Sequence, residues 1–387
     1  MSKKVFQTIV WMSLFLALSV GCIWAAEPIK IGIVWPLTGA NAAAGSYMVA
    51  GAEIGRDKIN AEGGILGRPI KLFIEDGAQD PAISVSAAEK LITRDKIDLF
   101  MGAMGSSPTI AVSTSVTRKY GMPHVVETAG AGKVTEEEGK RVKPWLFRIS
   151  PTNRMEAEGS EKNLQKMGIT KAALLLVNTD WGRDVATLFP KVLERIGGKA
   201  VMTDFFNLDQ AEFLTQLTKI KSSDANGIIV AGHQATIALI MKQYKQLGLT
   251  QKVLTLGGGI VPEGLVELAG KEAAEGVYIN IFFTPWFPEL TKIPQEAKWF
   301  ADEYLKRGNP VKGFGECFRG YDGLKAMKAA LEIAKTTDKE KVREAFAKVD
   351  TWGLSGHIKF DSFGQSTPTV SVITVKNGKP AIPEFMK

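Results

Sequence analysis

Cysteine and histidine are scarce in this chain of 387 residues. It has two cysteines, Cys22 and Cys317, and three histidines, His124, His233 and His357. Because Cys22 lies in an apolar N-terminal leader, Cys317 would be alone in the rest of the chain, and we expect no internal disulfide. The sequence also has no HExxH run and no paired Cys/His cluster. We therefore predict neither a metal site nor any other cofactor.

Sequence motifs of the common enzyme classes are missing as well. Ser106 is followed by Ser107-Pro108, so it does not stand in a GxSxG nucleophile elbow. The run GAGKVT at 130–135 matches neither a P-loop nor a GxGxxG turn. We predict a protein that binds its ligand without transforming it.

Charge and hydrophobicity are those of an ordinary globular protein. The formal net charge is +7, but the basic residues are scattered and form no block with interleaved aromatic residues. This distribution argues against binding to nucleic acid. Hydrophobic residues make up 45% of the chain, and the length is enough for two domains, each with a core of its own.

The N-terminal segment has the pattern of a secretory signal peptide at residues 1–26. Lys3 and Lys4 precede an apolar run at 5–20, and small residues at 21–26 allow cleavage after Ala25 or Ala26. An alternative is lipidation of Cys22, for which the preceding Gly21 is suitable but Ser19 is a poor match. Either route places the mature protein outside the cytoplasm, in the periplasm. No later apolar run is long enough to span a bilayer.

Downstream of the leader, short apolar strands alternate with helical patterns in two cycles, which predicts parallel sheets with right-handed crossovers. The first cycle has strands at 29–35, 70–75, 97–101 and 123–126, and the second at 171–177, 199–206, 227–231, 252–256 and 277–283. Helical patterns at 295–307, 317–334 and 339–348 follow, and the tail resembles a hairpin of 357–360 with 368–375. The predicted fold is therefore α/β, with two doubly wound lobes.

The turn after the third strand is the first candidate binding site. Gly102 and Gly105 allow a sharp turn, and Ser107 is predicted to cap a helix in which Pro108 occupies the first turn. Free N–H groups and the hydroxyls of Ser106 and Ser107 would suit a carboxylate. The alternative is a capped turn without a ligand.

Other candidates stand where strands end, since ligands of open α/β sheets gather at the carboxyl ends of strands. Two facing lobes would bring these ends into one cleft. Trp35 and Trp181 have an alternative role as packing aromatics, and His233 as a polar residue at a helix start. The residues at or just beyond such ends are Trp35, Gly105, Thr128, Trp181, His233 and Gly257.

Several segments together resemble the branched-chain amino acid-binding family. They are IKIGIVWPLTG, AGAEIGRDKINAEGGILGRPIKL, EDGAQDP, MGAMGSSPT and FRISPT. The resemblance implies an extracytoplasmic receptor of an ABC importer with the type I periplasmic binding fold. It also implies three lobe crossings, placed near Ser150, Phe283 and Gly356, and lobes formed by 27–149 with 284–355 and by 150–283 with 356–387. We expect a monomer whose closed, ligand-bound form is recognised by a membrane permease.

The resemblance also implies roles for individual residues. Ser106, with Ser107 and Gly105, would bind the ligand carboxylate. The segment Thr128, Ala129 and Gly130 would hold the amino and carboxylate groups. Trp181 and His233 would contact the ligand side chain.

Two positions depart from the family pattern and leave the ligand class open. Gly130 stands where relatives typically have Thr, and Gly258 where amino-acid binders commonly have an acid for the ammonium. Glu127 or Glu316 would have to replace that charge, or the ligand lacks an ammonium group. The ligand is accordingly a branched-chain or other amino acid, or else an aromatic or aliphatic carboxylate or an amide. A second class of function with the same fold is the ligand-binding module of a chemosensory or regulatory system.

Overall fold

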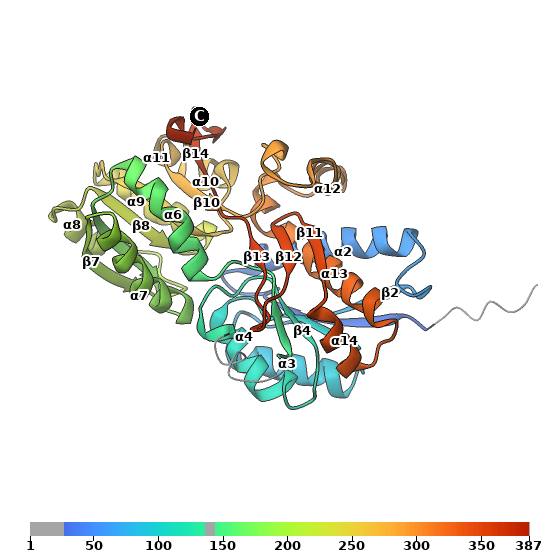
Figure 1. Cartoon of the computed structure of the whole chain (residues 1–387). Helices are drawn as coiled ribbons and strands as arrows, with labels where there is room; N and C mark the ends of the chain where they lie inside the picture. The colour runs from blue at the N-terminus through green and yellow to red at the C-terminus, as the bar shows by residue number, and fades with distance from the viewer. Residues whose placement is uncertain (1–26, 136–143, 387) are drawn as a thin grey trace, which may run out of the picture.

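The computed structural model describes residues 27–135 and 144–386. The predicted leader and Cys22 lie outside these residues. Two α/β lobes lie side by side (Figure 1). In the part of the chain that the structure describes, no helix is both long and apolar enough to cross a membrane.

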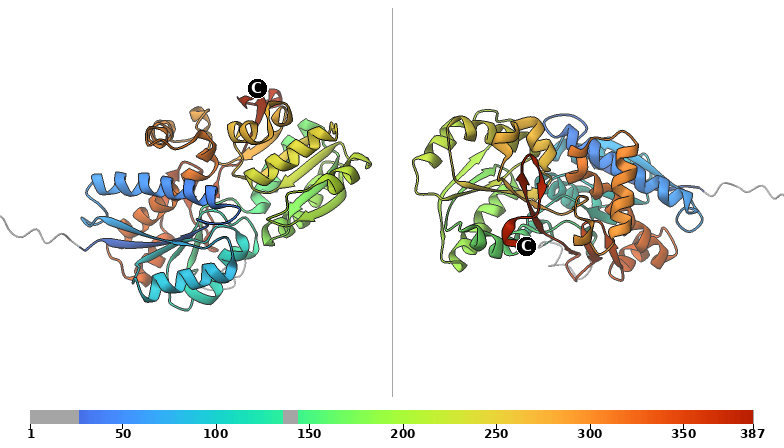
Figure 2. Two further views of the ribbon diagram at one scale, coloured as in Figure 1. Left: turned by 180° about the vertical axis from the view of Figure 1, so that it is seen from behind. Right: turned by 90° about the horizontal axis from the view of Figure 1, so that it is seen from above.

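The first lobe is built on a five-stranded parallel sheet in the order β2-β1-β3-β4-β5. Its helices α2 and α3 cover opposite faces of the sheet (Figure 2), and α13 packs along α2. The strands are β1 (Ile29–Trp35), β2 (Ile70–Asp76), β3 (Leu99–Gly102), β4 (His124–Val126) and β5 (Leu146–Arg148). The helices are α2 (Ala42–Ala61), α3 (Pro81–Thr93), α4 (Ser106–Val112) with the π-helical η1 (Ser113–Thr117), α12 (Pro294–Lys306), α13 (Phe314–Ala334) and α14 (Lys339–Phe346).

The second lobe is built on a seven-stranded sheet in the order β15-β14-β10-β9-β8-β6-β7. Its first five strands in the chain are parallel to one another. β14 pairs antiparallel with β10, and β15 pairs antiparallel with β14. The strands are β6 (Lys171–Val177), β7 (Lys199–Phe206), β8 (Gly227–Ala231), β9 (Lys252–Gly258), β10 (Tyr278–Ile281), β14 (Ser371–Lys376) and β15 (Lys379–Ala381). The helices are α6 (Asn153–Met167), α7 (Asp180–Arg195), α8 (Leu214–Lys221), α9 (Gln234–Gln246), α10 (Pro262–Ala269) and α11 (Lys271–Ala274). Short 3₁₀ turns lie at Pro288–Leu290, Val311–Gly313 and Glu384–Met386.

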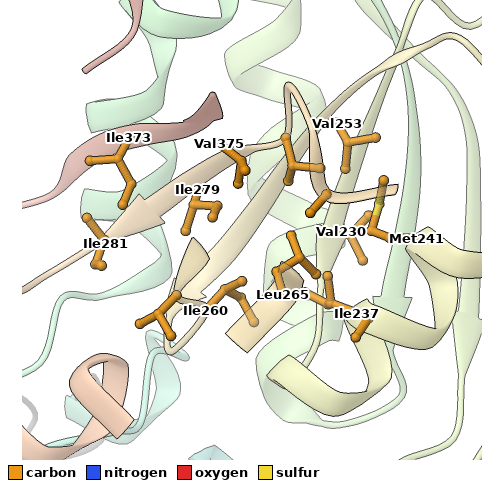
Figure 3. Packing of buried hydrophobic residues seen from close by; sticks show 14 of the residues in the cluster. Val230, Ile237, Met241, Val253, Ile260, Leu265, Ile279, Ile281, Ile373 and Val375 are labelled. Carbon is orange, nitrogen blue, oxygen red and sulfur yellow. The ribbon is translucent and has the colours of Figure 1, made fainter. Parts of the chain in front are cut away.

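The core of the second lobe explains why its strands are so apolar. β6 and β8 are buried on both faces, so their sequences are continuous hydrophobic runs rather than alternating patterns. On one face, Val230 and Ile279 of the sheet pack with Ile237 of α9 and Leu265 of α10 (Figure 3). This continuous pattern is the reason why the predicted bounds of β6 and β8 agree with the structure.

The predicted hairpin in the C-terminal tail is wrong for most of its second strand: only Thr367 and Pro368 pair with the first strand. Residues 357–360 lie in β12 (Gly356–Lys359), which pairs with β11 (Asp350–Gly353) and β13 (Thr367–Pro368) in a small antiparallel sheet. Residues 371–376 form β14, which pairs with β10 in the second lobe. The periodicity was compatible with both strands, but nothing local to the sequence specified their partners.

The position of this segment also shows that the chain does not make its third crossing between the lobes near Gly356, where it was predicted. Ile358 and Phe360 are buried in the core of the first lobe, where Phe360 meets Phe147 and Phe346 edge to face at 5.4 and 5.8 Å between ring centroids. The chain therefore stays with the first lobe until β13 and crosses between β13 and β14.

We expect Phe360→Ala to lower the free energy of unfolding by about 3 kcal/mol or more, because it removes a buried ring and leaves a cavity in the first lobe. Denaturant unfolding measures this loss. Phe363→Ala is the matched control: the same side chain three residues away is 47% exposed, and its removal should change stability by less than about 0.5 kcal/mol. Equal effects of the two substitutions would contradict the assignment of this segment to the core.

Candidate functional site

A cavity of about 260 Å³ lies between the two lobes. This volume is close to the lower limit of small-molecule sites, which usually span about 300–1,000 Å³. Residues from both lobes line it, so a ligand inside would contact both. The lining residues that matter below are Gln79, Gly105, Ser106, Ser107, Thr128, Gly130, Asn153, Glu156, Trp181, His233, Gly257, Gly259, Phe282, Glu316 and Arg319.

The first-lobe wall of the cavity is the turn from β3 into α4. Gly105 has a φ of +90°, which favours glycine, and its N–H donates to Thr128 Oγ1 at 3.0 Å. The hydroxyl of Ser106, only 2% exposed, accepts from the N–H of Ala131 at 3.1 Å. The N–H groups of Ser106 and Ser107 have no hydrogen-bond acceptor among the described residues. This wall can therefore donate hydrogen bonds to oxygens of a ligand.

Ser107 does not cap the helix, contrary to the prediction from sequence. Gly105 occupies the N-cap position and α4 begins at Ser106. The Ser107 hydroxyl instead accepts from the N–H of Asp180 in the second lobe at 3.3 Å. Thr109 supplies the local bonds, since its hydroxyl reaches the carbonyls of Ala103 and Gly105. The turn is thus held by Thr109, while Ser107 reaches across to the other lobe.

Two further hydrogen bonds cross the cleft. Gln79 Nε2 lies 3.2 Å from His233 Nε2, and the N–H of Gly132 donates to Asp184 Oδ2 at 3.0 Å. Together with the bond from Asp180 to Ser107, they join the lobes around the rim of the cavity. The lobes are therefore in direct contact on either side of the site.

The second-lobe wall carries two rings, those of Trp181 and His233, with their centroids 5.9 Å apart. Burial lowers the pKa of the His233 imidazole to about 4, so the ring is neutral at neutral pH. Trp181 lies in the first turn of α7, and His233 is the N-cap residue of α9. Both therefore follow the ends of strands, as predicted from the sequence. They offer a mostly apolar surface with one ring nitrogen able to hydrogen-bond.

Three consecutive glycines close the cavity at the end of β9. A side chain at Gly257 would collide with Trp181, one at Gly258 with Phe282, and one at Gly259 with the carboxylate of Glu316. Gly257 and Gly258 also have φ of +96° and +71°. The glycines are thus required by the groups packed against them, and Gly258 itself does not line the cavity.

Below the glycines lies a buried charged cluster that joins the lobes. Arg319 Nε donates to Glu316 Oε2 at 2.6 Å, and its two terminal nitrogens donate to the carbonyls of Glu127 and Gly257 at 2.8 and 2.9 Å. The Glu156 Oε1 atom accepts from the N–H of Gly257 at 2.8 Å. Burial raises the pKa of Glu156 to about 7 and also raises the pKa of Glu316, against the opposing effect of Arg319.

Comparison with known proteins identifies the family. The family model described as "Periplasmic binding protein" matches residues 28–380. The chain belongs to this family. Its members are solute-binding proteins, not enzymes, and the resemblance to branched-chain amino acid-binding proteins of the type I fold is confirmed.

Relatives of this binding protein match over almost their whole length. The "Amino acid binding protein" of Pseudomonas aeruginosa is 26% identical, with 94% of both chains covered. The "Leu/Ile/Val-binding protein BraC3" of Rhizobium johnstonii is 28% identical, with 88% of this chain and 91% of the relative covered.

Solved structures confirm the fold. LivJ of Streptococcus pneumoniae in complex with isoleucine superposes with a TM-score of 0.80 at 25% identity, covering 92% of this chain and 98% of that one. A solute-binding protein of R. palustris in complex with 4-hydroxybenzoate gives 0.81 at 21% identity, covering 92% and 96%.

Several predicted site residues lie away from the cavity of the binding protein. Trp35 is fully buried and its Nε1 donates to Glu127 Oε1 at 2.5 Å, so this pair packs behind the site. Ala129 is also buried, with its carbonyl accepting from Arg148 at 2.8 Å. Burial raises the pKa of Glu127 to about 8, so this carboxyl is mostly protonated at neutral pH. Trp35, Ala129, Gly258 and Glu127 are therefore not lining residues.

Sequence reasoning placed the other candidates at the cavity but overlooked Gln79, Asn153, Glu156, Phe282 and Arg319. Only Arg319 left a usable signal, since it stands three residues after Glu316 and so shares its helix face. Glu156 lies within a helix, away from any strand end. In the described residues, no group of three or more His, Cys, Asp or Glu is arranged to hold a metal.

We expect Glu156→Gln to make the ligand-free protein less sensitive to rising pH. The raised pKa means that wild-type Glu156 stabilises the fold while protonated, and that this contribution is lost as the pH rises from about 4.5 through about 7. Glutamine keeps an oxygen for the N–H of Gly257 and cannot ionise. The unfolding free energy of Glu156→Gln minus that of wild type should therefore increase between about pH 5 and pH 8.

Urea unfolding at both pH values tests this expectation. Glu158→Gln, an exposed position on the same helix, is the control and should follow the wild type. A Glu156→Gln curve that stays parallel to wild type across this range would contradict the buried, protonated state of Glu156.

Proposed function

We propose that this chain is the extracytoplasmic substrate-binding component of an ABC importer, and that it delivers a small carboxylate-bearing solute to a membrane permease. One observation supports a carboxylate ligand: the N–H groups of Ser106 and Ser107 have no hydrogen-bond partner in the described part of the chain and stand at the cavity wall beside the hydroxyl of Thr128. Donors of this kind suit an anionic oxygen. The names of the relatives, which bind amino acids or aromatic carboxylates, support the same assignment.

Binding and closure follow from the position of the cavity. In this proposal the Ser106 turn binds the carboxylate in the first lobe, and Thr128 orients it. Trp181 and His233 then cover the body of the ligand from the second lobe. A ligand that contacts both lobes stabilises the closed form by the difference between its affinities for the closed and open forms.

The location and the partners are part of the same proposal. The predicted signal peptide at 1–26 would export the chain to the periplasm, where it would act as a monomer. The permease would then distinguish the closed form from the open one. The sequence supports export through the charge and apolar pattern of the leader.

A thermal-shift screen of protein stripped of ligand by unfolding and refolding tests the proposed function. We expect a ligand at about 100 times its Kd to stabilise the native state by roughly 2.7 kcal/mol. The panel contains branched-chain and aromatic amino acids, benzoate- and cinnamate-type acids, dicarboxylates, urea and short amides. Stabilisation by carboxylates supports the proposal, whereas stabilisation by urea or amides alone would contradict it.

We further expect Ser106→Ala to weaken binding of the ligand found in that screen by about 1–3 kcal/mol, because a buried charged oxygen loses a partner. Isothermal titration calorimetry measures the change in Kd. Ser115→Ala, an exposed hydroxyl on the adjoining turn, is the control and should leave Kd as in wild type. An unchanged Kd in Ser106→Ala would exclude the Ser106 hydroxyl from the carboxylate site, since alanine keeps the backbone N–H.

A further inference from the structure

Glu316 has one carboxylate oxygen in use and one to spare. Its Oε2 atom is bound by Arg319, while Oε1 has no hydrogen-bond partner among the described residues. The side chain is buried yet lines the cavity. The Oε1 atom is not fully enclosed by protein, so a donor placed in the cavity can reach it.

The spare oxygen occupies the place of a missing side chain. A Cβ atom added to Gly259 would collide with Glu316 Oε1. The end of β9 bears glycine at 257, 258 and 259, so that strand provides no acid of its own. The first turn of α13 instead puts a carboxylate into the space beside the turn.

Arg319 pairs with Glu316 through Oε2, so this carboxylate offers the cavity Oε1 alone. Arg319 is already shared between Glu316 and two backbone carbonyls. Arg183 donates to Asn178, and His233 is neutral. Among ligands whose carboxylate the Ser106 turn would hold, one with an ammonium group can donate to Oε1, whereas a plain carboxylate has no donor for it.

We propose that Glu316, held in place by Arg319, accepts a hydrogen bond from an ammonium group of the ligand through Oε1, and so selects zwitterionic amino acids over the corresponding plain carboxylates. This inference rests on the proposed function, in which the Ser106 turn binds the carboxylate. Glu127 is excluded from this role by its position behind the cavity, where it bonds to Trp35. Glu156 also has one oxygen without a partner among the described residues, but its bonded oxygen accepts only from Gly257 and Asn280, whereas the direct bond from Arg319 favours the charged form of Glu316.

Paired probes that differ only in the ammonium group test the inference by calorimetry. The first pair is L-leucine and 4-methylpentanoate, and the second is L-phenylalanine and 3-phenylpropanoate. We expect wild type to bind the amino acid of at least one pair 10-fold or more tightly than its partner. In Glu316→Gln that preference should fall to about 2-fold or less, and Glu316→Asp should retain part of it. Glu332→Gln, an exposed position on the same helix, should keep the wild-type preference.

The outcomes separate this inference from the proposed function. Equal binding of both members of a pair, tighter binding of the plain carboxylate, or a preference that persists in Glu316→Gln would each overturn the role of Glu316, while leaving a carboxylate receptor intact. Binding of no member of either pair would overturn the role of Glu316 for these amino acids, and stabilisation by none of the carboxylates in the thermal-shift panel would contradict the proposed carboxylate site itself. Thermal unfolding of each variant confirms that it is folded, and Glu316→Asp tests the role should Glu316→Gln prove unstable.

Discussion

The guanidinium of Arg319 is the contact on which the interlobe region depends. It lies on α13 in the first lobe and bonds to Glu316 on the same helix, to the end of β4 and to the end of β9 in the second lobe. A planar group with five donors can serve three acceptors at fixed angles, which an ammonium cannot do. Its burial is tolerated because each direction meets an oxygen.

The glycines at 257–259 pack against this charged cluster from the second lobe. Arg319 donates to the carbonyl of Gly257, and Trp181, Phe282 and Glu316 each pack against one of the three positions. Three consecutive glycines suggest a flexible loop, yet here they allow close packing of large and charged groups. The three glycines therefore leave the space into which the large and charged residues around the cavity pack.

The sequence predicted the features that depend on neighbouring residues and missed those that depend on contacts between distant segments. The apolar runs of β6 and β8 specified strands directly, and Ser106, Thr128, Trp181 and His233 were found because strand ends meet in one cleft. Arg319 and Glu156 enter the cavity from helices whose faces the sequence does not orient relative to it. The partner of β12 depends on a contact between Phe360 and Phe147, more than 200 residues apart, which no local pattern reports.

Besides the bond from Arg319 to Gly257, three hydrogen bonds join the two lobes around the rim of the cavity. They are the bonds from Asp180 to Ser107, between Gln79 and His233 and from Gly132 to Asp184, which are 3.3, 3.2 and 3.0 Å long and partly buried. Each replaces a bond to water, so its net contribution is about 1 kcal/mol or less. Burial of a ligand that fills the cavity and pairs with both walls adds a term that the empty protein lacks. In the proposed function, a ligand that bonds to both walls would add to these modest contacts and so favour the closed form over the open one.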